Sequence, residues 1–194
     1  MLILLRHGRT PNNRDARLQG QSDSPLDEVG REQARLAGEY LRRRYDIDAV
    51  VTSPLTRTIQ TVEAAGFGGD GVSFDERWRE IDFGEYDERR IGEVIADLND
   101  RWRADPGYTP ADGESMSAMH DRVVGACLDL ADAAQTENVL VVTHATPIKS
   151  AAVWALDGSA EMILNLWVNL ATVTVLDHVA DNVVLREFNS RASE

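Results

Sequence analysis

The sequence predicts an α/β fold, a three-layer sandwich with a mostly parallel central sheet, in a single domain over residues 1–194. Three short apolar segments, residues 2–5, 49–52 and 139–143, support this prediction. Each is too short for a helix and apolar without alternation, which is typical of parallel strands covered on both faces. Each is followed by loop residues and then by a helical pattern, so strands and helices alternate along the chain.

Two of the predicted helices follow directly from strands. Ser53 and Thr146 each precede a proline, and a capping side chain before a proline is typical of a helix start. We therefore expect helices near residues 54–65 and 147–156, with Ser53 and Thr146 as their caps.

Two longer helices are predicted from apolar residues spaced three or four positions apart. One begins after Asp27, and the other begins near Ser115. The apolar stripe of the second helix includes Cys127, the only cysteine of the chain, which we expect in the core and not as a reactive thiol.

The remaining segments are predicted as late strands and loops. Strands are expected at residues 172–175 and 183–188, with a turn at residues 181–182 between them. Loops are expected at residues 66–71 and 104–113, and the second is predicted to be a lid. The glycines of the first match the dinucleotide-binding fingerprint, but they follow a helix instead of a strand, so no nucleotide site is predicted.

The composition excludes several functions. The chain has 20 Lys+Arg against 33 Asp+Glu, a net charge of −13 and a pI of about 4.7, which disfavours binding to nucleic acid or anionic membranes. The apolar N-terminal stretch ends at Arg6, and residues 162–176 fall short of the roughly 20 apolar residues of a membrane span. We expect a cytoplasmic protein with no membrane or nucleic-acid partner.

Basic side chains and imidazoles follow the predicted parallel strands. Arg6 and His7 end the first strand, Arg57 follows the second, and His144 follows the third. The carboxyl ends of such strands meet at one edge, so these four side chains are expected to form an anion site. Guanidinium groups suit phosphoryl oxygens, and a neutral His7, its pKa lowered by Arg6, can attack phosphorus.

These residues also carry a family resemblance. Arg6-His7-Gly8-Arg9-Thr10 with Asn13 resembles the signature of the histidine phosphatase superfamily, in the branch that includes the cofactor-dependent phosphoglycerate mutases. Further blocks follow in the family's order: Arg17-Leu18-Gln19-Gly20, Ser53-Pro54-Leu55 with Arg57, Glu80 with Phe83-Gly84, Gly113-Glu114-Ser115, and His144 with Ile148.

The resemblance implies a phosphoglycerate mutase-like fold and a set of catalytic residues. His7 would become the phosphohistidine, His144 would stabilise the transferred phosphoryl group if it is protonated, and Glu80 would protonate the leaving oxygen. Asp82 is the alternative acid and is less favoured than Glu80. The substrate-binding and phosphate-binding residues would be Arg6, Asn13, Gln19, Gly20, Arg57 and Ala145, with no metal and no cofactor.

Some positions depart from the family pattern. Arg9 stands where the family often has Glu or Gln, and Ala145 begins the segment that replaces a glycine pair. Arg9 either contacts a second anionic group of the substrate or pairs with a carboxylate, and we favour the pairing. His120 and His178 are expected to be surface or structural residues.

The sequence thus predicts a metal-independent phosphomonoesterase acting on a small phosphorylated metabolite. Mutase-type phosphoryl transfer is the near alternative, less favoured because 194 residues leave little chain for a closing lid. A phosphate-binding regulator without turnover is disfavoured because His7 and Glu80 are both present. Substrate specificity is expected to come from residues 14–24, 82–92 and 104–114. Trp154, Leu164 and Trp167 are expected either on a homodimer surface or in the core, and the sequence leaves both alternatives open.

Overall fold

The computed structural model describes residues 1–179 and 182–191, and it confirms the predicted α/β sandwich. The central sheet has six strands in the order β3-β2-β4-β1-β5-β6. The strands are β1 (Leu2–Arg6), β2 (Ala49–Thr52), β3 (Val72–Phe74), β4 (Val139–Thr143), β5 (Thr172–Val179) and β6 (Asn182–Arg191).

Most of the sheet is parallel. Strand β4 lies between β1 and β2 and is parallel to both, and β3 is parallel to β2. The late strands add an antiparallel edge, because β5 is antiparallel to β1 and β6 to β5. Both are longer than predicted, and Asp181 of the expected turn lies outside the described residues.

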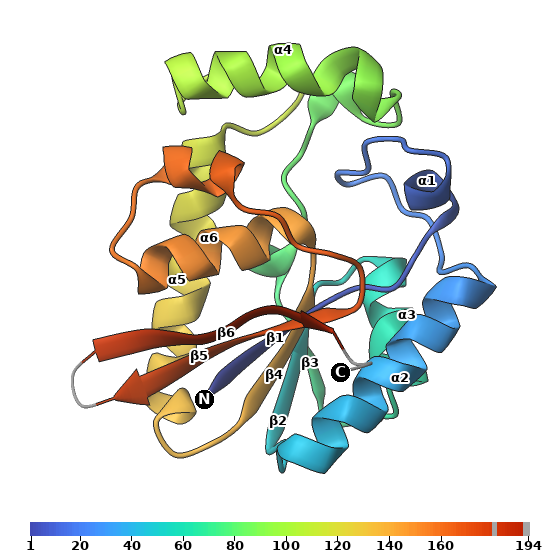
Figure 1. The fold of residues 1–194 in the computed structure, drawn as a ribbon, viewed down its shortest axis with the longest axis vertical. Coiled ribbons are helices and arrows are strands. Elements are labelled where there is room, and N and C mark those ends of the chain that lie inside the picture. The colour runs from blue at the N-terminus through green and yellow to red at the C-terminus, as the bar shows by residue number, and fades with distance from the viewer. Residues whose placement is uncertain (180–181, 192–194) are drawn as a thin grey trace.

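Helices cover both faces of the sheet (Figure 1). The pair α2 and α3 lies on one face, and α5 and α6 lie on the other. The short helix α1 and the longer α4 lie beyond the carboxyl ends of the parallel strands. The helices are α1 (Pro11–Arg14), α2 (Glu28–Arg44), α3 (Thr56–Ala64), α4 (Ile91–Ala104), α5 (Met116–Ala134) and α6 (Ala145–Ala155), with 3-10 turns η1 (Glu76–Trp78), η2 (Gly84–Tyr86) and η3 (Ala160–Asn165).

The residues of β1 alternate between two cores. Leu2 and Leu4 belong to the larger core with α5 and α6, whereas Ile3 and Leu5 belong to the smaller core with α2 and α3. All four side chains are buried, which explains why the strand is apolar without alternation. Cys127 is fully buried in the larger core, which confirms its predicted place.

The predicted caps of α3 and α6 are wrong. Helix α3 begins two residues later than expected, after Leu55, and α6 begins two residues earlier, after His144. Neither helix has a side-chain cap. Ser53 instead contacts His144, and Thr146 lies inside α6, where its backbone N–H binds Glu80. Ser53 and Thr146, which local capping rules assigned to the helix ends, instead bind the site residues His144 and Glu80.

The predicted lid is also wrong. No residue from 104–113 lines the cavity described below; the element that covers the cavity is α4. Residues 66–71 connect α3 to β3, so the glycine motif has the reversed context expected of a chance match. Within the described residues, none of the helices is long and apolar enough to cross a membrane.

Candidate active site

The turn after β1 places His7 at the sheet edge. His7 continues the pairing of β1 with β4, since its backbone N–H donates to Thr143 O at 3.0 Å. The next residue, Gly8, packs directly on α2, and a Cβ there would lie 2.2 Å from the carbonyl oxygen of Gly30. No larger side chain fits this approach, so the glycine lets the chain turn immediately after His7.

His7 is held as a neutral imidazole with one free nitrogen. Its Nδ1 lies 2.7 Å from the carbonyl oxygen of Gly8, so Nδ1 carries the proton and Nε2 keeps its lone pair. The side chain is only 3% exposed. Burial, followed by the charges of Arg57 and Arg6, lowers the pKa of His7 well below its usual value. A neutral His7 ring at neutral pH, as the sequence predicted, follows from this environment.

His144 lies beside His7 as part of a second hydrogen-bonded chain. The two ring centroids are 5.2 Å apart, with an interplanar angle of 61°. Arg57 Nε donates to His144 Nδ1 at 3.2 Å, so Nε2 carries the proton and donates to Ser53 Oγ at 2.9 Å. Burial and Arg57 lower the pKa of His144 well below its usual value. The ring is therefore neutral here, and the positive charge comes from the arginines.

Arg6 and Arg57 supply fixed positive charge. Arg57 is fully buried and uses three of its five N–H groups, since it also donates to Ser22 O at 2.9 Å and to Gly20 O at 2.6 Å. Arg6 Nη1 donates to Val168 O at 2.6 Å. Burial lowers the pKa of both guanidinium groups to about 10, which leaves both protonated at neutral pH.

Glu80 is a buried carboxylate at the start of α6. Its Oε1 accepts from the backbone N–H of Ile81 at 2.9 Å and from that of Thr146 at 3.2 Å. The first turn of a helix has unpaired N–H groups that suit a carboxylate. Asp82, the alternative acid, accepts from the backbone of Gly84 and does not line the cavity, so the geometry favours Glu80.

A half-buried ion pair fixes the segment that carries Glu80. Arg122 on α5 pairs with Glu114, with Nε and Oε1 2.7 Å apart. The same guanidinium donates to the carbonyl oxygens of Arg77, Arg79 and Glu80. The sequence motifs included Glu114 but not Arg122. Arg122 was missed because it is about forty residues from the segment of Glu80 that it holds, and the sequence carries no local signal of that contact.

Six of the predicted residues line one cavity of about 260 Å³, which we call the inner cavity. They come from β1 and the turn after it, α1 and the loop that follows it, the segment after η1 and the start of α6: Arg6, His7, Asn13, Gln19, Glu80 and Ala145. The three other predicted residues, Gly20, Arg57 and His144, lie behind this wall. Gly20 acts by holding Arg57, as its carbonyl oxygen accepts from that side chain.

Thr10 orients the two amide side chains of the cavity. Its backbone N–H donates to Asn13 Oδ1 at 3.1 Å, and its hydroxyl donates to Gln19 Oε1 at 2.7 Å. With its oxygen engaged, Gln19 presents Nε2, which is buried and has no hydrogen-bond partner within residues 1–179 and 182–191. A buried amide donor without a partner is available to a substrate oxygen.

The far wall of the inner cavity was not predicted. It consists mostly of apolar side chains from α4 and from residues 163–168, among them Ile95, Trp102, Ile163 and Leu166, together with the polar Asn99 of α4 and Lys149 of α6. The spacing of Ile91, Val94, Leu98 and Trp102 was the available signal for α4. Arg9 is outside this wall and pairs with Asp27, with Nε and Oδ2 2.8 Å apart, which confirms the favoured reading.

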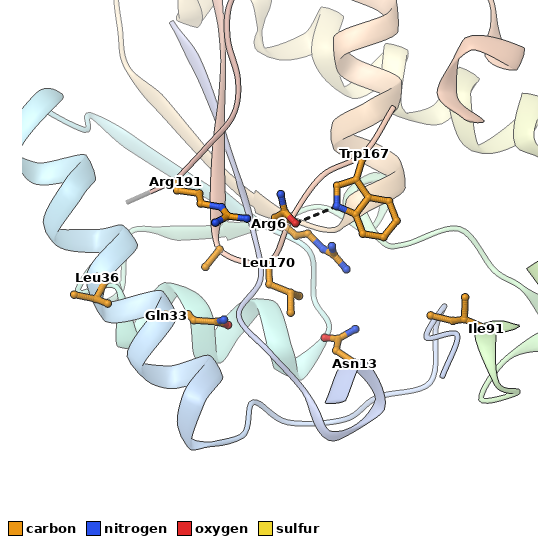
Figure 2. A pocket seen from close by; sticks show the side chains of 10 residues that line it. Arg6, Asn13, Gln33, Leu36, Ile91, Trp167, Leu170 and Arg191 are labelled. Carbon is orange, nitrogen blue, oxygen red and sulfur yellow. Dashed lines mark hydrogen bonds between the residues drawn. The ribbon is translucent and has the colours of Figure 1, made fainter. Parts of the chain in front are cut away.

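A shallower cleft of about 500 Å³, which we call the outer cleft, adjoins the inner cavity. In Figure 2, Arg6 and Leu170 lie near the middle of the cleft, with Trp167, Asn13 and Ile91 on the right of the view and Arg191, Gln33 and Leu36 on the left. Arg6, Asn13, Ile91 and Trp167 line both spaces. Trp167 is 71% exposed and its Nε1 donates to Asn169.

The site therefore combines a neutral imidazole with a free nitrogen, two buried guanidinium groups and a carboxylate, an arrangement suited to phosphoryl chemistry. The family model of the histidine phosphatase superfamily (branch 1) matches residues 2–191. The chain belongs to this superfamily.

Curated relatives carry different names. "Bifunctional protein Rv2228c" of Mycobacterium tuberculosis is 36% identical over 184 residues, 93% of this chain and 50% of the relative, so the chain spans half the length of that protein. "Probable phosphoglycerate mutase GpmB" of Citrobacter koseri is 38% identical over 150 residues, 74% of this chain and 68% of the relative.

Solved structures of phosphatases share the fold. The chain is similar to phosphoserine phosphatase of Entamoeba histolytica, with a TM-score of 0.85, 26% identity and coverage of 97% of this chain and 96% of the other. It is similar also to mycobacterial glucosyl-3-phosphoglycerate phosphatase Rv2419c, with a TM-score of 0.84, 29% identity and coverage of 97% and 98%. These neighbours confirm the mutase-like fold and support a phosphoryl-handling enzyme.

Proposed function

We propose that the protein is a metal-independent phosphomonoesterase that hydrolyses a small phosphorylated metabolite through a phosphohistidine on His7. The observation that carries the proposal is the neutral His7 ring, which has its Nδ1–H on Gly8 and its Nε2 free at the wall of the inner cavity. Arg6, Asn13 and Gln19 on the same wall supply donors for phosphoryl oxygens.

The proposed reaction has two displacements at phosphorus. His7 Nε2 attacks phosphorus, the bond from phosphorus to the ester oxygen breaks, and Glu80, which must be protonated when the substrate is bound, gives its proton to the departing alkoxide. The deprotonated Glu80 then takes a proton from water, whose oxygen attacks phosphorus. The bond from phosphorus to Nε2 breaks, inorganic phosphate leaves, and neutral His7 and protonated Glu80 are restored. Arg57 supports the transition state from behind through its charge and through His144.

Trapping the phosphoenzyme tests this proposal. Purified enzyme is mixed with labelled p-nitrophenyl phosphate in EDTA, quenched in alkali and assayed for acid-labile, base-stable label and for released phosphate. Wild type is expected to show both, and His7→Ala neither. His120→Ala, a half-buried imidazole outside the cavity, is the control and is expected to retain both.

Three outcomes would contradict the proposal. Undiminished turnover in His7→Ala would show that His7 is not the nucleophile. Complete loss of turnover in EDTA that returns with a divalent metal would show that the enzyme requires a metal. Tight vanadate binding without turnover of any ester favours a regulator. Mutase-type transfer, which the GpmB relatives keep as a second candidate, predicts an isomerised monophosphate in place of free phosphate.

A further inference from the structure

Lys149 is a half-buried cation in the wall of the inner cavity. It is the only lysine of the chain and lies on α6, one helical turn beyond Ala145. Because a helix rises about 1.5 Å per residue, the backbone of Lys149 is about 6 Å along the helix from that of Ala145. Its side chain lines the same cavity as His7 and Glu80.

The protein leaves this ammonium group without a partner of its own. Lys149 forms no ion pair and donates no side-chain hydrogen bond within the part of the chain that the structure describes. Glu80 is the carboxylate that acts on its pKa, but the oxygens of Glu80 already accept from Ile81 and Thr146. Burial lowers the pKa of Lys149. Partial burial of an ammonium group without an ion-pair partner is unfavourable, and a bound anion would relieve that cost.

The rest of the cavity identifies where such an anion would lie. In the proposed function the phosphoryl group is bound at His7, and the neighbouring wall from α4 and residues 163–168 is mostly apolar, with Asn99 as its polar side chain. Lys149 adds a cation to the cavity one helical turn beyond Ala145. A substrate that extends from His7 along α6 therefore meets mainly apolar side chains and a positive charge.

We propose that Lys149 binds a second anionic group of the substrate, a carboxylate or a second phosphate. The substrate is then a phosphomonoester whose body is short and partly apolar and whose other end is negatively charged. This inference rests on the proposed phosphomonoesterase function and adds the substrate class. It makes Lys149 a specificity-determining residue and not part of the phosphoryl transfer.

A set of three matched esters tests the inference. They are 4-propylphenyl phosphate, 4-(2-carboxyethyl)phenyl phosphate and 4-(2-phosphonoethyl)phenyl phosphate, which share a similar leaving group and differ in the charge at the far end. Wild type is expected to prefer at least one charged ester by about 10- to 100-fold in kcat/KM, the range of a hydrogen bond to a charged group. The favoured ester identifies carboxylate or phosphate as the second anion.

Variants assign the preference to Lys149. Lys149→Met keeps the length of the side chain and removes its charge, and it is expected to bring the ratio of charged to neutral ester close to one; Lys149→Arg should restore part of it. Arg43→Met removes the same charge from the exposed end of α2 and should leave the ratio unchanged. An equal preference in wild type overturns the inference, as does a Lys149→Met variant that slows all three esters by the same factor.

Binding measurements separate this inference from the proposed function. Calorimetric titration of His7→Ala with each ester needs no turnover, and the charged ester should bind about 10- to 100-fold more tightly than the neutral one. His7→Ala/Lys149→Met should lose this difference. If wild type hydrolyses no ester but the calorimetric difference is present, the proposed function fails and the second-anion site stands. If wild type hydrolyses the esters but the calorimetric difference is absent, the proposed function stands and the second-anion site fails.

Discussion

Substitution of Ser53 by alanine tests the hydrogen-bonded chain behind His7. Ser53 is fully buried, and its hydroxyl accepts the proton of His144 Nε2 at 2.9 Å. In Ser53→Ala this N–H is left buried without a partner, which costs about 1–3 kcal/mol of unfolding free energy. For a chain of 194 residues this corresponds to a fall in Tm of about 2–12 °C.

The same change affects catalysis because it frees the ring that Arg57 contacts. With no acceptor at Ser53, His144 is no longer fixed in one tautomer, and the Nε contact of Arg57 loses its partner for part of the time. A loss of 1.4–2.8 kcal/mol in transition-state stabilisation lowers kcat/KM about 10- to 100-fold. The assay is hydrolysis of p-nitrophenyl phosphate, with Tm measured by calorimetry.

Ser150→Ala is the matched control. Ser150 is also fully buried and its hydroxyl lies 2.8 Å from His120 Nδ1, so it makes the same type of contact outside the inner cavity. It should lower Tm and leave kcat/KM within about twofold of wild type. Equal losses of kcat/KM in the two variants, or no loss in Ser53→Ala, would refute the reasoning.

Three further predictions concern stability and reactivity. Below about pH 6.5 the histidines of the unfolded chain become protonated, whereas buried His7 and His144 stay neutral in the native state. The unfolding free energy measured with urea should therefore fall from pH 7.5 to 5.5, by up to about 1.4 kcal/mol per pH unit for each ring, and it should fall less steeply in His7→Asn. A rise of the unfolding free energy toward acid pH contradicts the lowered pKa values. A Cβ on Gly38 would lie 2.0 Å from Ala65 O, so Gly38→Ala should lower the unfolding free energy by about 1–3 kcal/mol. Gly125 lies in the interior of α5 with only the tip of an arginine near, so Gly125→Ala should raise the unfolding free energy by about 0.5–1 kcal/mol. A calorimetric measurement that finds the same sign for both variants contradicts this packing. Burial raises the pKa of Cys127, so a disulfide reagent should label it in urea and not in the native protein; rapid native labelling would place the thiol at the surface.

The sequence predicted the parts of the fold that depend on local patterns. Strands β1, β2 and β4 have continuous apolar runs, and α5 has a regular stripe, so both were predictable from spacing. The start of α6 was not, because the group that satisfies its first turn is Glu80, more than sixty residues earlier. Local capping rules contain no information on such partners.

The candidate site shows the same division. Arg6 and His7 were predictable because they end a buried strand, where an arginine next to a histidine is unusual. Lys149 has no such signal: a single lysine in a helix is ordinary until the fold shows that it faces the cavity. The roles of Arg57 and His144 as a layer behind the wall also required the hydrogen-bond geometry, since sequence order alone put them on the surface of the pocket.

The attachment of the reactive groups has a consequence for how new specificities arise. His7 is anchored by β1 and its pairing with β4, and Glu80 is anchored by the first turn of α6, so the spacing of these two residues is set by the sheet and its adjoining helix. The mostly apolar wall comes from α4 and residues 163–168, which contribute nothing to the sheet. Under the proposed function, evolution, or a library randomised over that wall, can therefore change the substrate while the residues that break the ester keep their positions.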